Sequence, residues 1–480
     1  MPSVLARATS IAAIVLLAAC GGGGQGADST MPPDGEDGRS EGDGPGGGEN
    51  LAGRCQDNFG PDRIDAGQDC APAYHEYCEG TFGNGGFSYD EVPACDGVVV
   101  ETVAIEDADT YAGFLKYVVL RPADTDPRAV VTSLHFRELL RDPNKAAHTY
   151  GTQMRLHELV KGRNAMVILP GAPGGNWQQF SPTGLLDSIE ESGLGDLPLL
   201  DLLGGVDSPL FGLLEGIGLP VGLLDALFGN AGTLGDVADA LDNLAPLVGS
   251  IDDYLQYART ARDHALARFG GAELPQFASG LSNGATYAMR LACQYPDEVD
   301  AFMTVGGAVS ALEAEACKDN PPVGSVQVHG INDPLSPYIG IITYPIRGGV
   351  PPINEDYADG EVDGIPEGVT TAVLREQPGL FLDVFGPNNG CSDEVEASVI
   401  PAGAAGRGEI AGDVVIERFA DCTAPEGHKS YMVTVTRGGH NWPGYDAPSG
   451  RNVNALGLVS YDFDATLYGF DLMWRAAGLE

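Results

Sequence analysis

The chain has 480 residues, long enough for one large domain with extensions, and 43% of them are hydrophobic, which is ordinary for a globular protein. This composition excludes a fibrous or wholly disordered chain. Its 68 acidic and 26 basic residues give a net charge of −42. A surface this acidic repels nucleic-acid phosphates and anionic lipid headgroups, so we expect no nucleic-acid partner.

The first 19 residues are typical of a signal peptide, with Arg7 as the positive flank and a short apolar run at residues 11–19. The run is too short to cross a membrane as a helix. It ends in Leu-Ala-Ala before Cys20, which resembles the lipobox of bacterial lipoproteins and implies cleavage before Cys20 and lipidation of its thiol. The alternative is ordinary secretion after cleavage at a small residue. We therefore expect an extracytoplasmic protein, secreted or attached to the bacterial envelope only through a lipid on Cys20.

Two segments are predicted between the signal peptide and the main domain. Residues 20–50 start at Cys20 and continue as a Gly- and Asp-rich stretch that cannot bury apolar area, so we predict a flexible tether. Residues 51–97 show little periodic hydrophobicity and are predicted to form a small disulfide-stapled segment, either a brace or a binding module. The cysteines of this segment are Cys55, Cys70, Cys78 and Cys95.

Cysteine usage favours disulfides and argues against a metal. Without Cys20 the chain has eight cysteines, and an even number in an exported protein suggests disulfide pairing. The pairing of the four clustered cysteines cannot be deduced, while the other four fall into two natural pairs further along the chain. No two cysteines have the CxxC spacing of a zinc site, so no structural metal is expected.

Residues 98–480 are predicted to form an α/β domain with a largely parallel sheet, because short apolar runs alternate with amphipathic stretches. The predicted strands are 116–120, 129–134, 165–169, 276–279, 301–305, 325–328 and 431–435. The predicted helices are 147–161, 251–269, 283–294 and 464–476. Residues 181–248, rich in Leu, Gly and Asp, are predicted to be short amphipathic helices inserted in the domain. They form either a lid over an apolar substrate site or a packing insertion.

The strongest local motif is Gly-Leu-Ser-Asn-Gly at residues 280–284, a GxSxG pentapeptide between a predicted strand and a predicted helix. Strand, tight turn and helix together make a nucleophile elbow, which exposes the serine hydroxyl above the sheet. The glycines are needed because the turn is strained and the neighbouring elements approach closely. We therefore predict Ser282 as a nucleophile, with the backbone N–H of Asn283 directed at an oxyanion.

A serine nucleophile at such an elbow needs an acid and then a histidine, in that chain order. Asp333 follows the predicted strand 325–328, and His440 follows the predicted strand 431–435 in a glycine-rich loop. Catalytic groups of open α/β sheets gather at such strand ends. We therefore predict that His440 takes the Ser282 proton while Asp333 orients the imidazole.

Two other histidines compete for the role of base. His329 precedes the predicted acid and so breaks the expected chain order. His428 lies in a polar stretch before the last predicted strand. Neither position fits the order as well as His440.

Six motifs together resemble a known family. They are GLSNGA at 280–285, RLACQYPD at 290–297, HGINDPLSPY at 329–338, NGC at 389–391, DC at 421–422 and GGHNWPG at 438–444. They are similar to the extracellular poly(3-hydroxybutyrate) depolymerase and feruloyl esterase-like group of α/β-hydrolases, over roughly residues 110–480. The resemblance implies the α/β-hydrolase fold, secreted carboxylic-ester hydrolysis by the Ser282–Asp333–His440 triad, and no cofactor. It also supports two disulfides, Cys293–Cys317 and Cys391–Cys422.

One departure from this family concerns the second oxyanion donor. The family usually has His-Gly after the strand that ends here at Leu134, whereas this chain has Phe136 and then Arg137 after the histidine. The backbone N–H of Phe136 or Arg137 remains the expected donor, although a bulky residue restricts the loop. Loss of one oxyanion donor costs about 100- to 1,000-fold in rate.

A glycine-rich segment at residues 171–177 lacks both the GxGxxG spacing and the lysine of a P-loop, so it is not expected to bind a nucleotide. The resemblance places it beside the active site. Trp177 and Trp442 are then either an apolar wall for an acyl or aromatic group, or core residues.

Two functional hypotheses follow from the sequence. The first is a serine esterase acting on esters of hydroxyalkanoates, short polyesters or phenolic acids, with a substrate that can be polymeric. The alternative is a surface lipoprotein with a binding or structural role and a degenerate hydrolase fold, which the Phe136 departure and the Cys-rich segment favour.

Overall fold

The computed structural model describes most of the predicted main domain. The described residues are 78, 91–110, 112–136, 142–175, 177, 251–307, 314, 317–318, 320–333, 336, 338, 380–392, 394–403, 411–444, 453–454 and 457–479. The signal peptide, Cys20, the tether, Cys55, Cys70, Arg137 and the insertion at 181–248 lie outside these residues, so the predictions made for them stay predictions.

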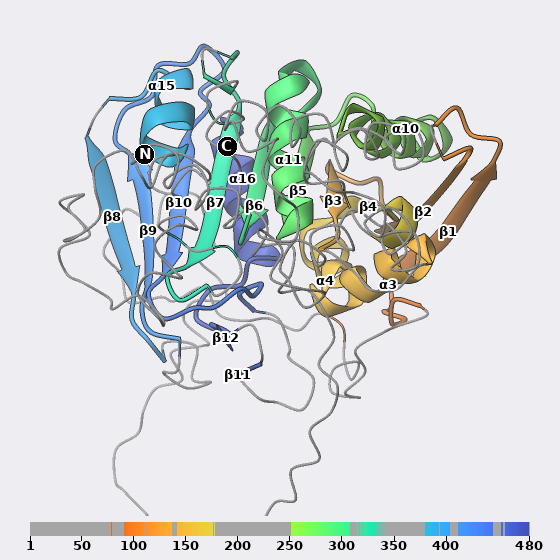
Figure 1. Cartoon of the computed structure of the whole chain (residues 1–480), viewed down its shortest axis with the longest axis horizontal. Coiled ribbons are helices and arrows are strands. Elements are labelled where there is room, and N and C mark those ends of the chain that lie inside the picture. The colour runs from red at the N-terminus through yellow and green to blue at the C-terminus, as the bar shows by residue number, and fades with distance from the viewer. Residues whose placement is uncertain are drawn as a thin grey trace, which may run out of the picture.

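One ten-stranded sheet spans the described domain, in the order β1-β2-β4-β3-β5-β6-β7-β10-β9-β8 (Figure 1). Its central strands, from β4 to β10, run parallel, and antiparallel strands complete both edges. The strands are β1 (Val98–Glu106), β2 (Phe114–Pro122), β3 (Ala129–Leu134), β4 (Ala165–Pro170), β5 (Gln276–Leu281), β6 (Ala301–Val305), β7 (Gly324–Gly330), β8 (Val395–Ile400), β9 (Val414–Phe419) and β10 (Ser430–Val435).

The burial of each strand explains which ones the sequence predicted. β3, β4, β6, β7 and β10 are buried along their whole length, as strands covered on both faces require, and all were predicted from continuous apolar runs. β1, β8 and β9 were missed. β1 and β8 are partly exposed edge strands in which charged and small residues interrupt the apolar pattern.

Helices cover both faces of this sheet. On one face lie α3 (Pro143–Gln153), α4 (Leu156–Arg163) and α16 (Leu467–Ala476), which share a core with β2, β4 and β7. On the other face lie α10 (Ile251–Phe269) and α11 (Asn283–Gln294), which share a second core with alternate residues of the same sheet. A mostly parallel sheet in this order, with helices on both faces, is the α/β-hydrolase fold.

The single helix predicted at 147–161 was wrong, because the chain breaks into α3 and α4 at Arg155. This residue has a left-handed backbone with φ 54°. Its side chain is buried, with Nη1 3.1 Å from Asp464 Oδ2 and Nη2 3.9 Å from Glu158 Oε1. A buried guanidinium needs such partners, and periodicity alone does not reveal a break that supplies them.

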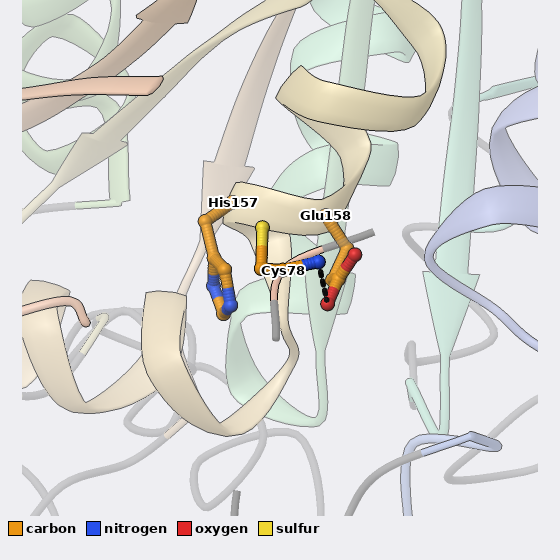
Figure 2. Close-up of side chains that lie close together, drawn as sticks. All are labelled: Cys78, His157 and Glu158. Atoms are coloured by element: carbon orange, nitrogen blue, oxygen red, sulfur yellow. Dashed lines mark hydrogen bonds between the residues drawn. The ribbon is translucent and has the colours of Figure 1, made fainter. Parts of the chain in front are cut away.

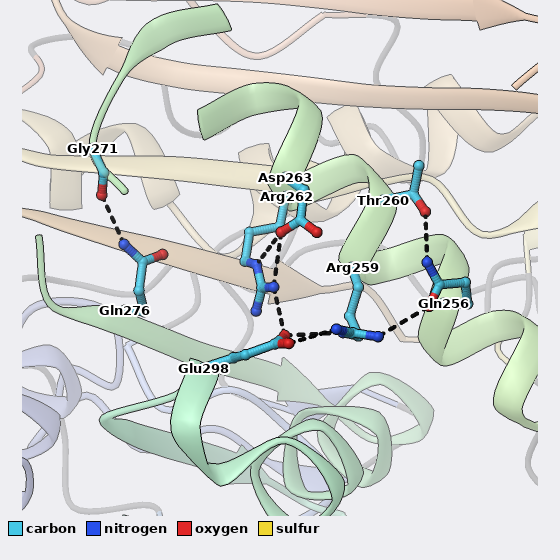
Figure 3. A network of polar contacts seen from close by, with 8 residues as sticks. All are labelled: Gln256, Arg259, Thr260, Arg262, Asp263, Gly271, Gln276 and Glu298. Carbon is cyan, nitrogen blue, oxygen red and sulfur yellow. Dashed lines mark hydrogen bonds and ion pairs between the residues drawn. The ribbon is translucent and has the colours of Figure 1, made fainter. Parts of the chain in front are cut away.

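Ion pairs at the amino ends of the parallel strands join α10 to the segment before β6. Figure 3 shows Glu298, the last residue of the short helix η3 (Pro296–Glu298), between Arg259 and Arg262. Arg259 Nε donates to Glu298 Oε2 at 2.9 Å, and Arg262 Nη2 donates to the same oxygen at 2.6 Å. The hydrogen bond from Arg259, helped by the one from Arg262, lowers the pKa of the Glu298 carboxyl although burial opposes it.

Three disulfides staple the described domain. They join Cys293 to Cys317, Cys391 to Cys422, and Cys78 to Cys95. The first two are the pairings that the family resemblance implied. Loops of this length stabilise a fold by about 3 kcal/mol each when closed by a disulfide.

Among the described residues no helix is both long and apolar enough to span a membrane.

Candidate active site

The predicted nucleophile lies on a tight turn between β5 and α11. Ser282 has φ 57° and ψ −119°, a backbone conformation that non-glycine residues rarely adopt and that costs about 1–3 kcal/mol. The glycines beside it allow neighbouring backbones to meet. A Cβ atom on Gly280 would lie 2.4 Å from the backbone of Gly284, and one on Gly284 would lie 2.1 Å from the carbonyl oxygen of Leu134. The motif therefore forms a strained strand–turn–helix elbow.

Asp333 and His440 meet beyond the carboxyl ends of two neighbouring parallel strands, β7 and β10. His440 Nδ1 lies 2.7 Å from Asp333 Oδ2, and both side chains are buried. An ionised carboxylate only accepts hydrogen bonds, so the proton is assigned to Nδ1. This tautomer leaves Nε2 as the basic nitrogen of His440.

Strand β6 lies next to β5 and connects the nucleophile to the base. The N–H of Ser282 donates to the carbonyl of Val305, the last residue of β6, at 2.8 Å. The next residue, Gly306, passes so close to the imidazole that a Cβ atom there would lie 3.1 Å from His440 Nδ1. His440 Nε2 is buried and makes no hydrogen bond to any described residue, so the bond to Ser282 Oγ is not formed in this structure. Such bonds are often long in ligand-free enzymes and tighten when substrate binds.

The surroundings of Asp333 keep its side chain ionised. Burial by itself would raise the pKa of this carboxyl group, but the charge of His440 and hydrogen bonds from His329 and His440 outweigh burial. The pKa of Asp333 therefore lies well below its ordinary value. The backbone N–H of Ser336 also donates to Asp333 Oδ1, at 2.7 Å. The Asp333 carboxyl group is therefore ionised at neutral pH.

The two competing histidines do not occupy the position of a base. His428 precedes β10 whereas His440 follows it, and a strand of this length separates its two ends by roughly 20 Å. Burial lowers the pKa of His428, with Glu426 acting in the opposite direction. His329 directs Nε2 at the carbonyl oxygen of Ser336, 2.6 Å away.

The predicted oxyanion donors are placed in part. The N–H of Asn283 belongs to the first turn of α11, where N–H groups have no partner within the helix. The ring of Phe136 packs edge-to-face on Tyr150 with a centroid distance of 6.2 Å, while its carbonyl lies 2.6 Å from Nδ1 of His135. The bulk of Phe136 is thus accommodated in the core. Arg137 lies outside the described residues.

A pair of hydrogen bonds ties the nucleophile turn to the loop after β4. The side chain of Asn283 accepts the N–H of Trp177 at 2.9 Å and donates to its carbonyl at 2.6 Å. The indole of Trp177 is fully buried and contacts the ring of His135. His135 Nε2 in turn accepts the N–H of Ala172, and burial lowers the pKa of His135 to about 4. A neutral His135 and Asn283 together hold the glycine-rich loop beside Ser282.

The two tryptophans, for which the sequence left open a wall of the substrate site or a place in the core, are both buried. Trp442 donates its indole N–H to Thr466 Oγ1 at 3.0 Å and packs edge-to-face on Tyr150. Trp177 Nε1 is buried and has no hydrogen-bond partner among the described residues. Trp442 is therefore packed as a core residue, and Trp177 lies next to the nucleophile turn through its backbone.

Among the described residues, one cluster of potential metal ligands lies outside the triad. Figure 2 shows Cys78, His157 and Glu158 close together where the Cys-rich segment meets α4. Cys78 is bonded to Cys95 and so has no thiolate to offer a metal. Its N–H donates to Glu158 Oε1 at 3.2 Å, and burial lowers the pKa of His157 to about 4. The cluster packs the disulfide on α4.

Three contributors to the site were not predicted from the sequence. They are Gly306, Ser336 and the side chain of Asn283. Asp333 and Ser336 form an Asp-x-x-Ser pattern in which the carboxylate accepts a backbone N–H three residues later, a recognisable turn signal. Gly306 directly follows a predicted strand and belongs to a Gly-Gly pair, which also marks a close approach. The contact of Asn283 with Trp177 has no local signal, because the two residues are 106 positions apart.

Comparisons with known proteins give partial likenesses. No family model matches the chain. Over 199 residues the chain is 26% identical to "Putative esterase NocK" of Nocardia uniformis subsp. tsuyamanensis, a match that covers 41% of this chain and 48% of that protein. The chain thus spans about half the length of this curated relative.

Solved structures give a similarly distant likeness. Acetyl xylan esterase from Aspergillus awamori is 11% identical, with 70% of this chain and 92% of that one covered and a TM-score of 0.32. S-formylglutathione hydrolase FrmB from Staphylococcus aureus is 12% identical, with 50% and 80% covered and a TM-score of 0.28. The fold is therefore assigned from the strand order of this chain, and its site from the geometry described above.

Proposed function

We propose that the protein is a serine carboxylic-ester hydrolase with Ser282, His440 and Asp333 as its triad. One observation carries the proposal: the 2.7 Å hydrogen bond from His440 Nδ1 to Asp333 Oδ2, formed beside the strained Ser282 turn. A buried carboxylate that fixes an imidazole tautomer beside a strained serine turn is the arrangement used for acyl transfer.

The reaction proceeds in two steps. Ser282 Oγ attacks the ester carbonyl while His440 Nε2 takes its proton, and the imidazolium then protonates the departing alcohol. Water, activated by the same nitrogen, releases the acid from the acyl-enzyme. Asp333 stays ionised throughout and stabilises the imidazolium. The N–H of Asn283, with that of Phe136 or Arg137, stabilises the oxyanion.

The substrate class rests on the sequence motifs and on the insertion. We propose an ester of a hydroxyalkanoate, a short polyester or a phenolic acid, with the Leu-rich residues 181–248 covering an apolar acyl site. The proposed chemistry needs only the protein's own groups and water. The relative from Nocardia is named "Putative esterase NocK", and the match covers 48% of its length. Its name supports ester hydrolysis as the reaction.

We also propose that the protein acts outside the cytoplasm, attached by a lipid on Cys20. The lipobox-like sequence supports this placement. Cys20→Ser should then release soluble protein from membranes, whereas continued membrane retention would contradict the anchor.

The test of the enzymatic proposal uses the whole chain and a Ser282→Ala variant. The wild type should hydrolyse p-nitrophenyl acetate, butyrate or octanoate, and the variant should lose this activity while keeping the same melting temperature. The acyl-chain length of the ester that is hydrolysed fastest indicates the size of the acyl group that the site accepts. A folded wild type with no activity on the three esters would favour the alternative of a binding lipoprotein with a degenerate fold.

A further inference from the structure

A second histidine contacts Asp333, at the same carboxylate oxygen that accepts from His440. His329 is the penultimate residue of β7, four positions before Asp333, and the residue is 2% exposed. On the neighbouring strand β10 its partner in register is Thr434. The two histidines approach Asp333 from the ends of adjacent strands.

The contacts of His329 define which of its nitrogens carries the proton. Nε2 lies 2.6 Å from the carbonyl oxygen of Ser336, which can only accept, so Nε2 is the donor. The same nitrogen lies 3.2 Å from Asp333 Oδ2, the oxygen that also accepts from His440. The other nitrogen, Nδ1, is buried and makes no hydrogen bond to any described residue. His329 therefore acts through one N–H only.

These contacts close a small ring around the acid. The N–H of Ser336 donates to Asp333 Oδ1, the carbonyl of Ser336 accepts from His329, and His329 reaches Asp333 Oδ2. Among the described residues, the charged or titratable groups in contact with His329 are Asp333 and Tyr338, whose ring centroid is 5.9 Å away. The Tyr338 hydroxyl pairs with Thr434 and leaves the Nε2 side of the ring to Asp333 and Ser336.

We propose that His329 is a positioning residue for the triad, which holds the Asp333 carboxylate and its loop in the orientation that His440 requires. The proposal rests on the proposed function of the triad. His329 does not touch substrate. It acts on the reaction through Asp333, because a carboxylate free to rotate would no longer fix the Nδ1–H tautomer of His440.

The experiment compares three substitutions that differ in where they place an N–H. The amide nitrogen of Gln reaches the position of imidazole Nε2, the shorter Asn reaches only that of Nδ1, and Leu has no donor. We expect His329→Gln to keep most of kcat on p-nitrophenyl esters. His329→Asn and His329→Leu should lower kcat about 10- to 100-fold with little change in KM, the loss expected when a hydrogen bond to a charged group is removed. If the Leu variant does not fold, the comparison of the Gln and Asn variants still tests whether a donor at the Nε2 position is needed.

Labelling of Ser282 with a fluorophosphonate separates this inference from the proposed function. A wild type that neither hydrolyses esters nor labels would overturn the triad and the role of His329 with it. A wild type that labels, together with equal kcat in the Gln, Asn and Leu variants, would overturn the role of His329 alone. Equal losses in Gln and Asn would also overturn it, since a donor at the Nε2 position would then have no effect.

Discussion

The carboxyl and amino ends of the parallel strands differ in how they surround a carboxylate. At the carboxyl ends, Asp333 is buried and its oxygens face two histidines and a backbone N–H. At the amino ends, Glu298 sits between Arg259 and Arg262 in a partly exposed network (Figure 3). Taking a carboxylate out of water is expensive, whereas an exposed ion pair costs and contributes little. The difference fits the proposed function, in which the first end carries the chemistry and the second contributes to packing.

The largest effect is expected from a substitution of Asp333. Asp333→Asn keeps the shape of the side chain but favours the wrong tautomer of His440, so we expect kcat to fall by about 10,000-fold. Steady-state kinetics on a p-nitrophenyl ester measure the loss. Glu298→Gln is the matched control at the other end of the sheet and should leave kcat unchanged. A loss of similar size in both variants would contradict the contrast between the two ends.

The second prediction concerns the close approach of Gly284 to the backbone of Leu134, next to the nucleophile. A methyl group in Gly284→Ala would meet the carbonyl oxygen of Leu134 at 2.1 Å. The turn must then shift, so the free energy of unfolding should fall by about 3 kcal/mol and activity should be lost. Gly113→Ala is the control, because it meets no atom within 4 Å and only its φ of +65° opposes the change. Chemical denaturation and ester hydrolysis test both variants, and full activity in Gly284→Ala would count against the elbow.

The third prediction is that buried His135 makes the stability of the protein depend on pH. Burial lowers its pKa from 6.5 to about 4, so between these values the unfolded chain binds a proton that the folded protein excludes. Stability should therefore fall as the pH falls from about 6.5 to about 4, by about 3 kcal/mol from this residue. His157, lowered to about 4 by burial and by the charge of Arg155, contributes in the same direction. Denaturation of His135→Asn across this range should show a slope that is smaller by about one bound proton, and an unchanged slope would contradict a neutral, buried His135.

The smallest effect is expected at the amino-end network. Glu298→Gln removes the charge shared by two arginines whose side chains are partly exposed. We expect the free energy of unfolding to fall by about 1 kcal/mol or less, and by less still at high salt. Denaturation at low and high salt measures this effect. A loss of several kcal/mol that salt does not reduce would show that the network is as tightly coupled as the acid site.

Much of this architecture could be predicted from the sequence, for identifiable reasons. Fully buried parallel strands give continuous apolar runs, and the GxSxG motif has a defined local geometry. The edge strands β1 and β8 are half exposed, so their pattern is weak. The break at Arg155 depends on Asp464, a residue 309 positions away, and no local pattern reports it.

The site residues predicted from the sequence depended on chain order. Asp333 and His440 were chosen by chain order, and the structure brings the two side chains into contact. His329 was set aside because it breaks that order as a base. The order says nothing of a second donor to the same carboxylate oxygen, which the contacts of His329 with Ser336 and Asp333 show. The approach of Gly306 to the imidazole likewise depends on strands meeting in the sheet.

The most direct test of the central claim is mass spectrometry of the whole protein after reaction with a fluorophosphonate probe. A triad predicts one covalent adduct, on the peptide that contains Ser282. It also predicts no adduct in Ser282→Ala and a greatly slowed one in His440→Ala. An unlabelled wild type, or an adduct on another serine that survives Ser282→Ala, would contradict the assignment of this site.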